Sequence, residues 1–542
     1  MSAKFILLIG CFVFSTYSYA QPAIKMSVNG LNRLQTMDGI GVNINTRSWN
    51  DGELKPAIDL LVDSMQMKIF RLIVETPIEW EDVNDNDDPF VYNWKYYDSL
   101  YATPKFTSVW GTIAYLNKKG FSHNIMINLM GYVPAWMGGE TVDPKQEDEF
   151  VEMFVSFLQY ARNKQHLKFG LVAPFNESDI PKEGPQLTEF QYVSLMRKIM
   201  VRMKQSGMND IRFVGPDVGS MNKSVNRYIP EMMKDSLIMS GITRFAVHSY
   251  SGYHAPVDSL IKHSAFPNMK FWVTEWNAWR DGLDDGIKTA YNYQFAAQCM
   301  EYLLDFLKNG ATAALVWEGY DSYYDHHAPS LFSYWGILEY DKGNKTYTPR
   351  KHFFAISQIS KYVTPGSWQV ELQNSDSKAP AIAFFNPSRN APVIVGINTY
   401  NKPTQVEISL DNFPGIKSVQ LIFTDSINNL KIQKTYLPDK KGKLRIVVPA
   451  NCIYTLVAEP AATSGAGALN NKLKKKGWYA GDIHVHRNCG ESTPVYSVDY
   501  LASAMKQSGL SVISVLADMG NGEVYDAKTD LKLVTGKDAV QS

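Results

Sequence analysis

The chain has 542 residues, and its 54 Lys and Arg residues balance its 54 Asp and Glu residues. This charge balance gives no global reason to expect a nucleic acid or an anionic membrane as a partner. The length is too great for one ordinary domain, and a hydrophobic content of 45% is sufficient for large cores.

The first 20 residues have the pattern of a secretory signal peptide. Lys4 precedes the short apolar run FILLIGCFVF, and small residues follow at Ser18 and Ala20. The run is too short to span a bilayer, and no later stretch is long and apolar enough to do so. Within it, LIGC resembles a lipoprotein box, but the apolar run continues past the cysteine, which favours cleavage over lipidation. We expect residues 1–20 to be removed and the mature protein, without a transmembrane segment, to be periplasmic or extracellular.

Between about residues 37 and 362, short apolar segments alternate with amphipathic helical patterns. Several of these segments have no polar face, as strands of a parallel sheet covered on both sides require. The strand candidates are GIGVNIN near 39, KIFRLIV near 68, NIMINLM near 124, FGLVAPFN near 169, IRFVGPD near 211, RFAVHSY near 244, FWVTEW near 271 and TAALVWEG near 312. Eight such strands predict a (β/α)8 TIM barrel, an α/β fold, over residues 37–362. A doubly wound sheet is the alternative, but the glycine fingerprint of a dinucleotide site is missing.

After residue 362 the pattern changes to short strands separated by turn residues. Over residues 363–459 this pattern predicts an antiparallel β-sandwich, and the strand-like residues 23–36 are expected to pair with it. Residues 460–476 are small, flexible and basic in character, which is typical of a linker. A short, incomplete α/β segment is expected at residues 477–542.

Two of the predicted barrel strands end in a carboxylate. FNES places Glu177 at the end of the fourth strand, and VTEW places Glu275 at the end of the seventh. Active sites of TIM barrels lie at the carboxyl ends of the strands, so these side chains are expected to meet across the barrel mouth. Two carboxyl groups about 5–5.5 Å apart can cleave a glycosidic bond with retention of configuration. A single glutamate at a strand end is more often a helix cap or an ion-pair member, and only the pair favours catalysis.

These two segments resemble the paired signatures of the retaining (β/α)8 glycoside hydrolases of clan A. Family 30 is the most similar, because a β-sandwich follows the barrel and YVTPGS resembles its junction; family 5 is similar in DGIGVNIN. The resemblance covers about residues 30–460. It implies that Glu177 is the acid/base and Glu275 the nucleophile. The proline that usually follows the Asn-Glu pair is replaced by Ser178, which weakens the family assignment more than the catalytic one.

The resemblance also implies roles for residues that surround the pair. Asn176 would hydrogen-bond the sugar 2-hydroxyl. Arg71 would keep Glu275 ionised by its charge and hydrogen bonding, although a purely structural ion pair is the alternative.

Three aromatic residues and a histidine complete the expected pocket. His248 and Tyr250 lie on the same face of the sixth strand; the tyrosine would hydrogen-bond the nucleophile, and the histidine would line the pocket. Trp317, which closes the eighth strand, would lie beneath the sugar, and Trp136 after the third strand would flank the cleft. A satisfied interior histidine and ordinary core packing of the rings are the alternatives.

The terminal segment contains GDIHVH, which places His484 and His486 two residues apart on one face of a strand. Such a pair can present two ligands to a metal, and Asp518 after LSVISVL is a possible third. The motif resembles the opening of the polymerase-and-histidinol-phosphatase type of metallohydrolase domain, which implies two or three divalent ions. The chain stops before the later His and Asp ligands of such a domain, so we expect no functional metal site here.

Together these patterns predict a secreted O-glycosyl hydrolase that cleaves a β-linked polysaccharide or oligosaccharide by double displacement. The β linkage is implied by the clan resemblance alone. Glycoside hydrolysis needs no metal or organic cofactor. Two other functions stay open: a carbohydrate-binding barrel without catalysis, and a metal-dependent phosphoesterase whose activity lies in the terminal segment.

Overall fold

The computed structural model describes residues 23–75, 80–278, 288, 290–324, 332–413 and 415–461, together with four short strands in the C-terminal part. The expected signal peptide and Asp518 lie outside these residues, and His484 and His486 are described only as part of a strand. None of the described helices combines the length and the apolar character needed to cross a membrane.

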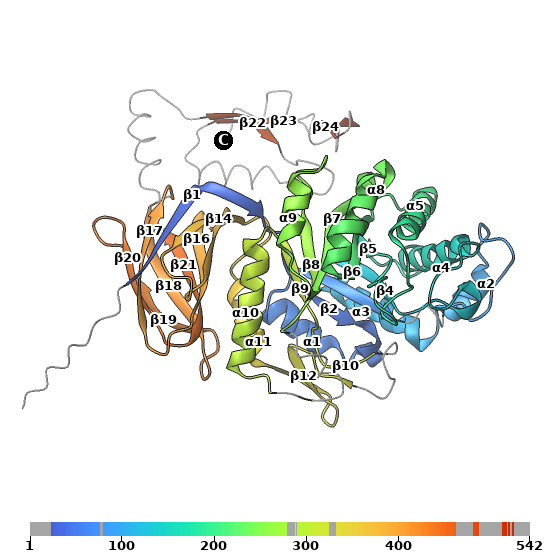
Figure 1. Ribbon diagram of the computed structural model, residues 1–542, viewed down its shortest axis with the longest axis horizontal. Coiled ribbons are helices and arrows are strands. Elements are labelled where there is room, and N and C mark those ends of the chain that lie inside the picture. Colours follow the sequence, from blue (N-terminus) through green and yellow to red (C-terminus); the bar gives the residue numbers. More distant parts are fainter. Residues whose placement is uncertain are drawn as a thin grey trace, which may run out of the picture. The chain divides into compact units, whose positions relative to one another are not determined.

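In the described residues, parallel strands close into a barrel in the order β2 to β9 (Figure 1). Strands β2, β3, β4 and β8 are buried along their whole length, because helices cover the outside of the barrel and side chains fill the inside. The prediction of a (β/α)8 barrel is therefore confirmed. The strands are β2 (Gly39–Asn45), β3 (Ile69–Glu75), β4 (Ile125–Met130), β5 (Leu171–Ala173), β6 (Arg212–Ser220), β7 (Ile242–Ser251), β8 (Phe271–Trp276) and β9 (Ala313–Val316).

The barrel interior is a packed core of one or two side chains from most strands, as expected for this fold. The inner cluster consists of Ile69, Met126, Leu171, Ala173, Val214, Ala246, Trp272, Ala313 and Leu315. Gly41 on β2 is required by this packing, since a Cβ atom there would lie 2.7 Å from the Leu315 side chain and from the Ile69 carbonyl oxygen.

The helices between the strands follow the apolar spacing of the sequence and begin at capping residues. Thr188 caps α5 by accepting from the Gln191 amide, and Asn292 caps α10 by accepting from the Phe295 amide. The helices are α1 (Lys55–Asp59), α2 (Trp94–Leu100), α3 (Pro104–Lys118), α4 (Glu147–Gln159), α5 (Glu189–Gln205), α6 (Met221–Lys223), α7 (Ile229–Met233), α8 (Ser236–Gly241), α9 (Ala255–Lys262), α10 (Tyr293–Lys308) and α11 (Lys351–Ser360). Two hairpins, β10 (Ser322–Tyr323) with β11 (Phe332–Ser333) and β12 (Leu338–Asp341) with β13 (Thr346–Pro349), follow β9.

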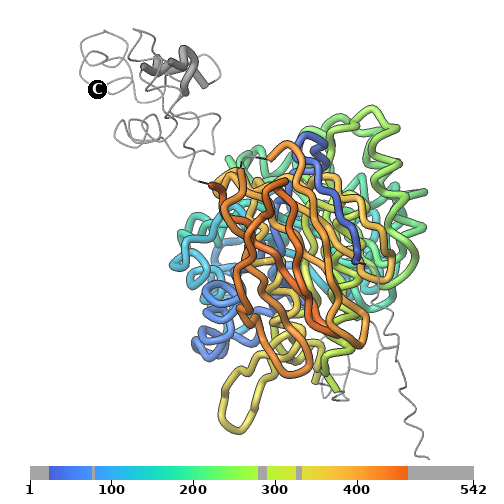
Figure 2. Tube along the Cα trace, turned by 90° about the vertical axis from the view of Figure 1, so that its left-hand side faces the viewer, coloured from blue at the N-terminus to red at the C-terminus, as the bar shows by residue number. Residues whose placement is uncertain are grey.

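The second domain is a mixed sheet in the order β19-β18-β21-β16-β15-β14-β1-β17-β20, whose strands lie side by side in Figure 2. The sequence pattern predicts an antiparallel sandwich, and the structure adds one parallel pair, because β1 enters from before the barrel and runs parallel to β17 but antiparallel to β14. The strands are β1 (Ile24–Thr36), β14 (Trp368–Asn374), β15 (Ala381–Asn386), β16 (Ala391–Asn398), β17 (Thr404–Asp411), β18 (Ile416–Thr424), β19 (Lys431–Tyr436), β20 (Leu444–Val448) and β21 (Cys452–Pro460).

The sheet is joined to the barrel through a common core. Apolar side chains of β15, β16 and β21, among them Phe384, Val395 and Ile453, belong to the same buried cluster as the outer face of the barrel. On α11, Gln358 donates to Thr424 Oγ1 (3.0 Å) and accepts from Thr455 Oγ1 (2.6 Å). The barrel and the sheet therefore form one compact unit up to Glu459.

The residues from Pro460 onward belong to a separate unit. In it, β22 (Gly481–His486), which carries the GDIHVH motif, pairs in parallel with β23 (Val512–Leu516), and β24 (Met519–Gly520) pairs with β25 (Glu523–Val524). The expectation that His484, His486 and Asp518 form no functional metal site stays a prediction.

Candidate active site

The two strand-end glutamates come from β8 and from the segment that follows β5. Glu275 is the fifth residue of β8, whereas Glu177 lies four residues beyond the end of the three-residue strand β5. Glu177 has a φ of 33°, and its backbone N–H donates to the Asp217 carbonyl oxygen (2.7 Å). A positive φ costs a non-glycine residue of the order of 1 kcal/mol, so the surrounding contacts hold this carboxylate in place.

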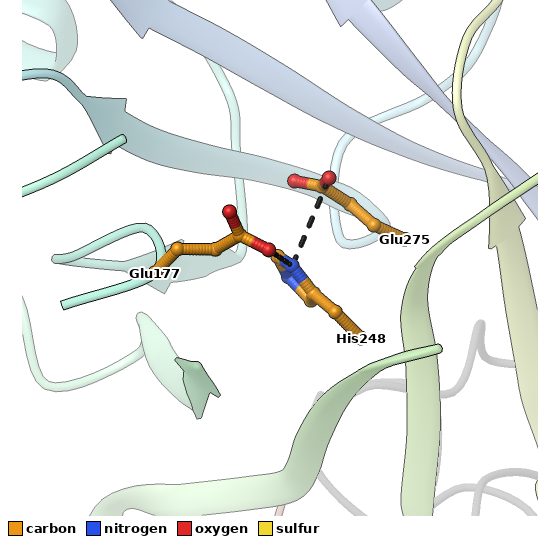
Figure 3. A group of neighbouring side chains, drawn as sticks. All are labelled: Glu177, His248 and Glu275. Carbon is orange, nitrogen blue, oxygen red and sulfur yellow. Dashed lines mark hydrogen bonds and ion pairs between the residues drawn. The ribbon is translucent and has the colours of Figure 1, made fainter. Parts of the chain in front are cut away.

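Glu177, His248 and Glu275 converge in one buried group (Figure 3). His248 Nδ1 lies 2.7 Å from Glu177 Oε1 and 3.7 Å from Glu275 Oε2. One carboxylate oxygen of Glu177 lies within 4.8 Å of one oxygen of Glu275. So short a separation suits a direct attack by one carboxylate, as in a retaining reaction, better than the wider gap that an inverting reaction needs for a water molecule.

Arg71 of β3 holds the group from below. Its Nη1 donates to Glu275 Oε1 (2.5 Å) and to Asn43 Oδ1 (2.9 Å), and its Nη2 donates to Asn176 Oδ1 (2.6 Å). Burial alone would lower the pKa of Arg71, but the charges of Asp217 and Glu275 raise it. The guanidinium is therefore a permanent positive charge against Glu275.

The protonation states of Glu177 and His248 differ from those of the free side chains. Burial raises the pKa of Glu177 to about 7; the hydrogen bond from His248 opposes this change and the charge of Glu275 adds to it. Burial alone would lower the pKa of His248, but the charge of Glu275 and hydrogen bonds to Asp217 and Glu177 raise it to about 10. At neutral pH the histidine is thus an imidazolium that donates to Glu177, while Glu177 is poised to hold or release a proton.

Asp217 of β6 is a further member of the site that the sequence analysis missed. It is fully buried, with Oδ2 3.4 Å from Arg71 Nη2 and Oδ1 3.5 Å from His248 Nε2, and it accepts a hydrogen bond from Thr274 Oγ1. Burial would raise the pKa of Asp217, but the charge of Arg71 and then the hydrogen bond and charge of His248 outweigh it, so the pKa is lowered. Asp217 therefore compensates both buried cations.

We expect Asp217→Asn to lower the free energy of unfolding by about 3 kcal/mol at pH 7, because it leaves Arg71 and His248 without their shared counter-charge. Since the folded pKa of Asp217 is below the unfolded value near 4, its contribution is complete above about pH 4 and is lost as the pH falls through the lower folded value. Urea unfolding of wild type and variant at pH 7 and pH 3 measures both effects.

The control for this prediction is Asp210→Asn, which removes an exposed partner of Arg162 just before β6. This change should alter stability by less than about 0.5 kcal/mol. Equal effects of the two substitutions would contradict the compensating role of Asp217.

A cavity of about 270 Å³ lies above the glutamate pair. Trp317, which follows β9, and Tyr250 of β7 line it as expected, and the charges of Glu275 and Glu177 add to burial in raising the pKa of Tyr250. The described lining residues are Met130, Glu177, Ile180, Glu183, Gly219, Tyr250, Ser251, Glu275, Trp317, Tyr324, Ser333 and Trp335. The cavity thus combines carboxylates with aromatic rings, which is a typical surface for a sugar.

Three of the expected pocket residues lie elsewhere than in the cavity wall. Asn176 and His248 are fully buried beneath it, where Asn176 bridges Arg71 and the Glu183 carbonyl oxygen. Trp136 lies in the short 3-10 helix Ala135–Met137, and its indole N–H donates to the Glu81 carbonyl oxygen (2.6 Å).

Several residues of the site could not be assigned from the sequence. Asn43 precedes the end of β2 and binds both Arg71 and the Thr274 carbonyl oxygen, and Trp335 and Tyr324 reach the cavity from the hairpin region after β9. For Asp217 a signal existed, since VGPDVGS places a carboxylate near the end of the fifth barrel strand, as FNES and VTEW do for theirs.

Glu177, His248 and Glu275 are also a set of side chains that could hold a metal ion. His248 would first have to lose the Nδ1 proton that it shares with Glu177, and its raised pKa opposes that loss. The arrangement suits acid–base chemistry better than metal binding.

The fold is similar to that of solved glycoside hydrolases. A family 30 subfamily 8 xylanase from Clostridium acetobutylicum matches with a TM-score of 0.60 at 16% identity, covering 80% of this chain and 99% of that chain. An endo-β-1,6-glucanase matches with a TM-score of 0.59 at 14% identity over 82% of this chain and 95% of that chain. A family 39 enzyme from Xanthomonas axonopodis pv. citri matches with a TM-score of 0.53 at 14% identity, covering 83% and 100%.

No protein-family model and no curated protein sequence matches the chain. The structural matches show the fold: a TIM barrel followed by a β domain. Solved family 30 glycoside hydrolases have a similar arrangement. At these sequence identities the likeness concerns the fold.

Proposed function

We propose that the protein is an exported retaining glycoside hydrolase that acts on a β-linked oligosaccharide or polysaccharide. The observation that carries this proposal is the approach of Glu177 and Glu275 to within 4.8 Å at the carboxyl ends of the barrel strands. The fold shared with glycoside hydrolases and the aromatic cavity above the pair support it.

In the first step, Glu275 attacks the anomeric carbon while the bond to the leaving oxygen breaks. Arg71 keeps Glu275 ionised, and Glu177, whose pKa of about 7 allows it to be protonated, gives its proton to the leaving oxygen. In the second step, Glu177 removes a proton from water, and the resulting nucleophile attacks the same carbon and releases Glu275. Both steps invert the anomeric carbon, so the product retains the configuration of the substrate.

The cavity favours a neutral sugar. Its described wall carries the carboxylates of Glu177, Glu183 and Glu275 but neither Lys nor Arg, and a uronic acid or sulfated sugar would be repelled. Trp317 would pack against the face of the sugar ring, and the Tyr250 hydroxyl would donate a hydrogen bond to Glu275.

The direct test is hydrolysis of aryl β-glycosides of neutral hexoses and pentoses, with the aryl β-glucuronide as the charged comparison. We expect turnover of at least one neutral glycoside, and proton NMR should show that the β-anomer of the sugar is released first. Initial release of the α-anomer would contradict the retaining mechanism. Absence of turnover with all glycosides, together with phosphatase activity that a chelator removes, would favour the terminal segment as the active part.

A further inference from the structure

The segment that carries Glu177 leaves β5 and makes a tight turn beside β6. The Ile180 N–H donates to the Glu177 carbonyl oxygen (2.8 Å), which closes a four-residue turn with Ser178 and Asp179 at its centre. None of these four residues belongs to a helix or a strand, and Glu177 has the unfavourable φ of 33°. Contacts outside regular secondary structure must therefore fix the position of the Glu177 carboxyl group.

Asp179 joins this turn to β6. Its Oδ1 accepts from the Gly219 N–H (2.8 Å), and its Oδ2 accepts from the Ser220 N–H (3.0 Å). The Asp179 side chain is only 1% exposed, and hydrogen bonds to an ionised group are roughly twice as strong as those between neutral groups. The carboxylate thus links two successive backbone amides of β6 to the turn that carries Glu177.

The charge of Asp179 is compensated by Lys223 of α6, the short helix that follows β6. Lys223 Nζ lies 3.5 Å from Asp179 Oδ2 and donates to the Asp179 carbonyl oxygen (3.3 Å). A neighbouring positive charge favours the ionised form of a carboxyl group, which is the form that accepts hydrogen bonds at both oxygens. Lys223 therefore supports the two bonds to β6.

Gly219, which donates to Asp179, also lies against the Glu177 side chain. It lines the cavity, and a Cβ atom on it would lie 2.9 Å from Glu177 Oε1 and 2.7 Å from Ile180 Cγ1. The backbone that Asp179 binds is therefore the surface against which Glu177 packs. A shift of the turn relative to β6 would move Glu177 Oε1 away from His248 Nδ1, which lies 2.7 Å from it.

We propose that Asp179 is a positioning residue that holds the Glu177 carboxyl group against His248 and toward the leaving oxygen of the substrate. This inference rests on the proposed function, in which Glu177 is the acid/base. Asp179 is not among the described residues that line the cavity, so it acts through Glu177 and not by touching the sugar. Its loss should weaken proton donation and leave the attack by Glu275 unaffected.

The experiment compares Asp179→Asn with wild type on two glycosides of the same sugar. Asparagine can accept from only one of the two amides, because its NH₂ group is a donor. For an alkyl glycoside, kcat/KM should fall by about 10-fold or more, since misplacing a catalytic group by about 1 Å can cost about 100-fold. For the dinitrophenyl glycoside, whose leaving group needs no proton, the rate of the first step should stay within about twofold of wild type.

The matched control is Asp235→Asn. Asp235 Oδ1 also accepts from two backbone N–H groups, those of Leu237 and Ile238, and Asp235 pairs with the basic residue Arg197. It caps α8, which directly precedes the start of β7, away from the strand ends that surround the cavity. This substitution should leave both rates at the wild-type value.

A second measurement needs no turnover. In protein labelled with ¹⁵N-histidine, the His248 Nδ1 proton that is shared with Glu177 should give a low-field NMR signal, identified by its loss in Glu177→Ala. Asp179→Asn should shift or broaden this signal, whereas Asp235→Asn should leave it unchanged. If the wild type hydrolyses no glycoside, the proposed function fails, and the NMR signal alone decides whether Asp179 positions Glu177.

Equal losses on both glycosides in a folded Asp179→Asn would indicate general structural damage and would overturn the proposal. Unchanged rates together with an unchanged His248 signal would equally overturn it. If circular dichroism shows that Asp179→Asn does not fold, Lys223→Met gives the same comparison, because the lysine side chain is 39% exposed. Lys223→Met should lower kcat/KM by about threefold for the alkyl glycoside only, and absence of this selective loss would then decide against the proposal.

Discussion

Glu275→Ala is expected to reduce the kcat for aryl β-glycosides by a factor on the order of 10⁵, because it removes the carboxylate proposed to attack the anomeric carbon. Glu275 is held by Arg71 at 2.5 Å, whereas Glu177 Oε1 lies against His248 Nδ1 at 2.7 Å. Glu177 therefore cannot replace it without also ceasing to be the proton donor.

A small nucleophile should partly restore the reaction. Azide entering the space left by the side chain can attack the same carbon and displace the aryl group, which gives a glycosyl azide of inverted configuration. Mass spectrometry and proton NMR of the product test this outcome. Glu301→Ala, which removes a carboxyl of α10 remote from the cavity, is the control and should keep wild-type turnover. Wild-type turnover in Glu275→Ala would contradict its role.

Glu177→Ala is expected to have a large effect that depends on the leaving group. For alkyl glycosides, kcat/KM should fall by about 10³-fold, because general-acid help is lost. For a dinitrophenyl glycoside, whose leaving group departs without a proton, the first step should be nearly unchanged, and the slow second step should make the glycosyl-enzyme accumulate. A burst of dinitrophenol in stopped-flow measurements reports this accumulation.

The pH profile gives a second measure of the same residue. Glu177 must be protonated in the first step, and its pKa is about 7. In the wild type, kcat/KM for alkyl glycosides should therefore fall as the pH rises through about 7, and this fall should be absent from the Glu177→Ala profile. An unchanged alkaline limb in the variant would assign the titration to another group.

The barrel could be predicted because its strands carry a repeated physical signal. Segments such as GIGVNIN and FWVTEW are apolar on both faces, which only a covered parallel sheet requires, and the structure places them as β2 and β8. Once the strands are assigned, their carboxyl ends are known, and Glu177 and Glu275 are then expected to meet at that end of the barrel.

Side-chain direction could not be predicted in the same way. Asn176 and His248 were expected in the pocket but lie beneath it, because the charges of Arg71 and Asp217, contributed by other strands, draw them inward. The single sequence does not show which polar residues share a buried network. Trp136 likewise turns toward Glu81 for a backbone acceptor that nothing in VPAWMGG indicates.

The position of strand β1 has a consequence for how the protein can be divided. Ile24–Thr36 lies in the interior of the nine-stranded sheet, between β14 and β17, although it precedes the barrel in the chain. A fragment that starts at the first barrel strand would therefore leave β14 and β17 with unpaired strand edges in the middle of the sheet, and such edges promote self-association. Because β1 belongs to the sheet but precedes the barrel in the chain, the barrel and the β domain must be produced together.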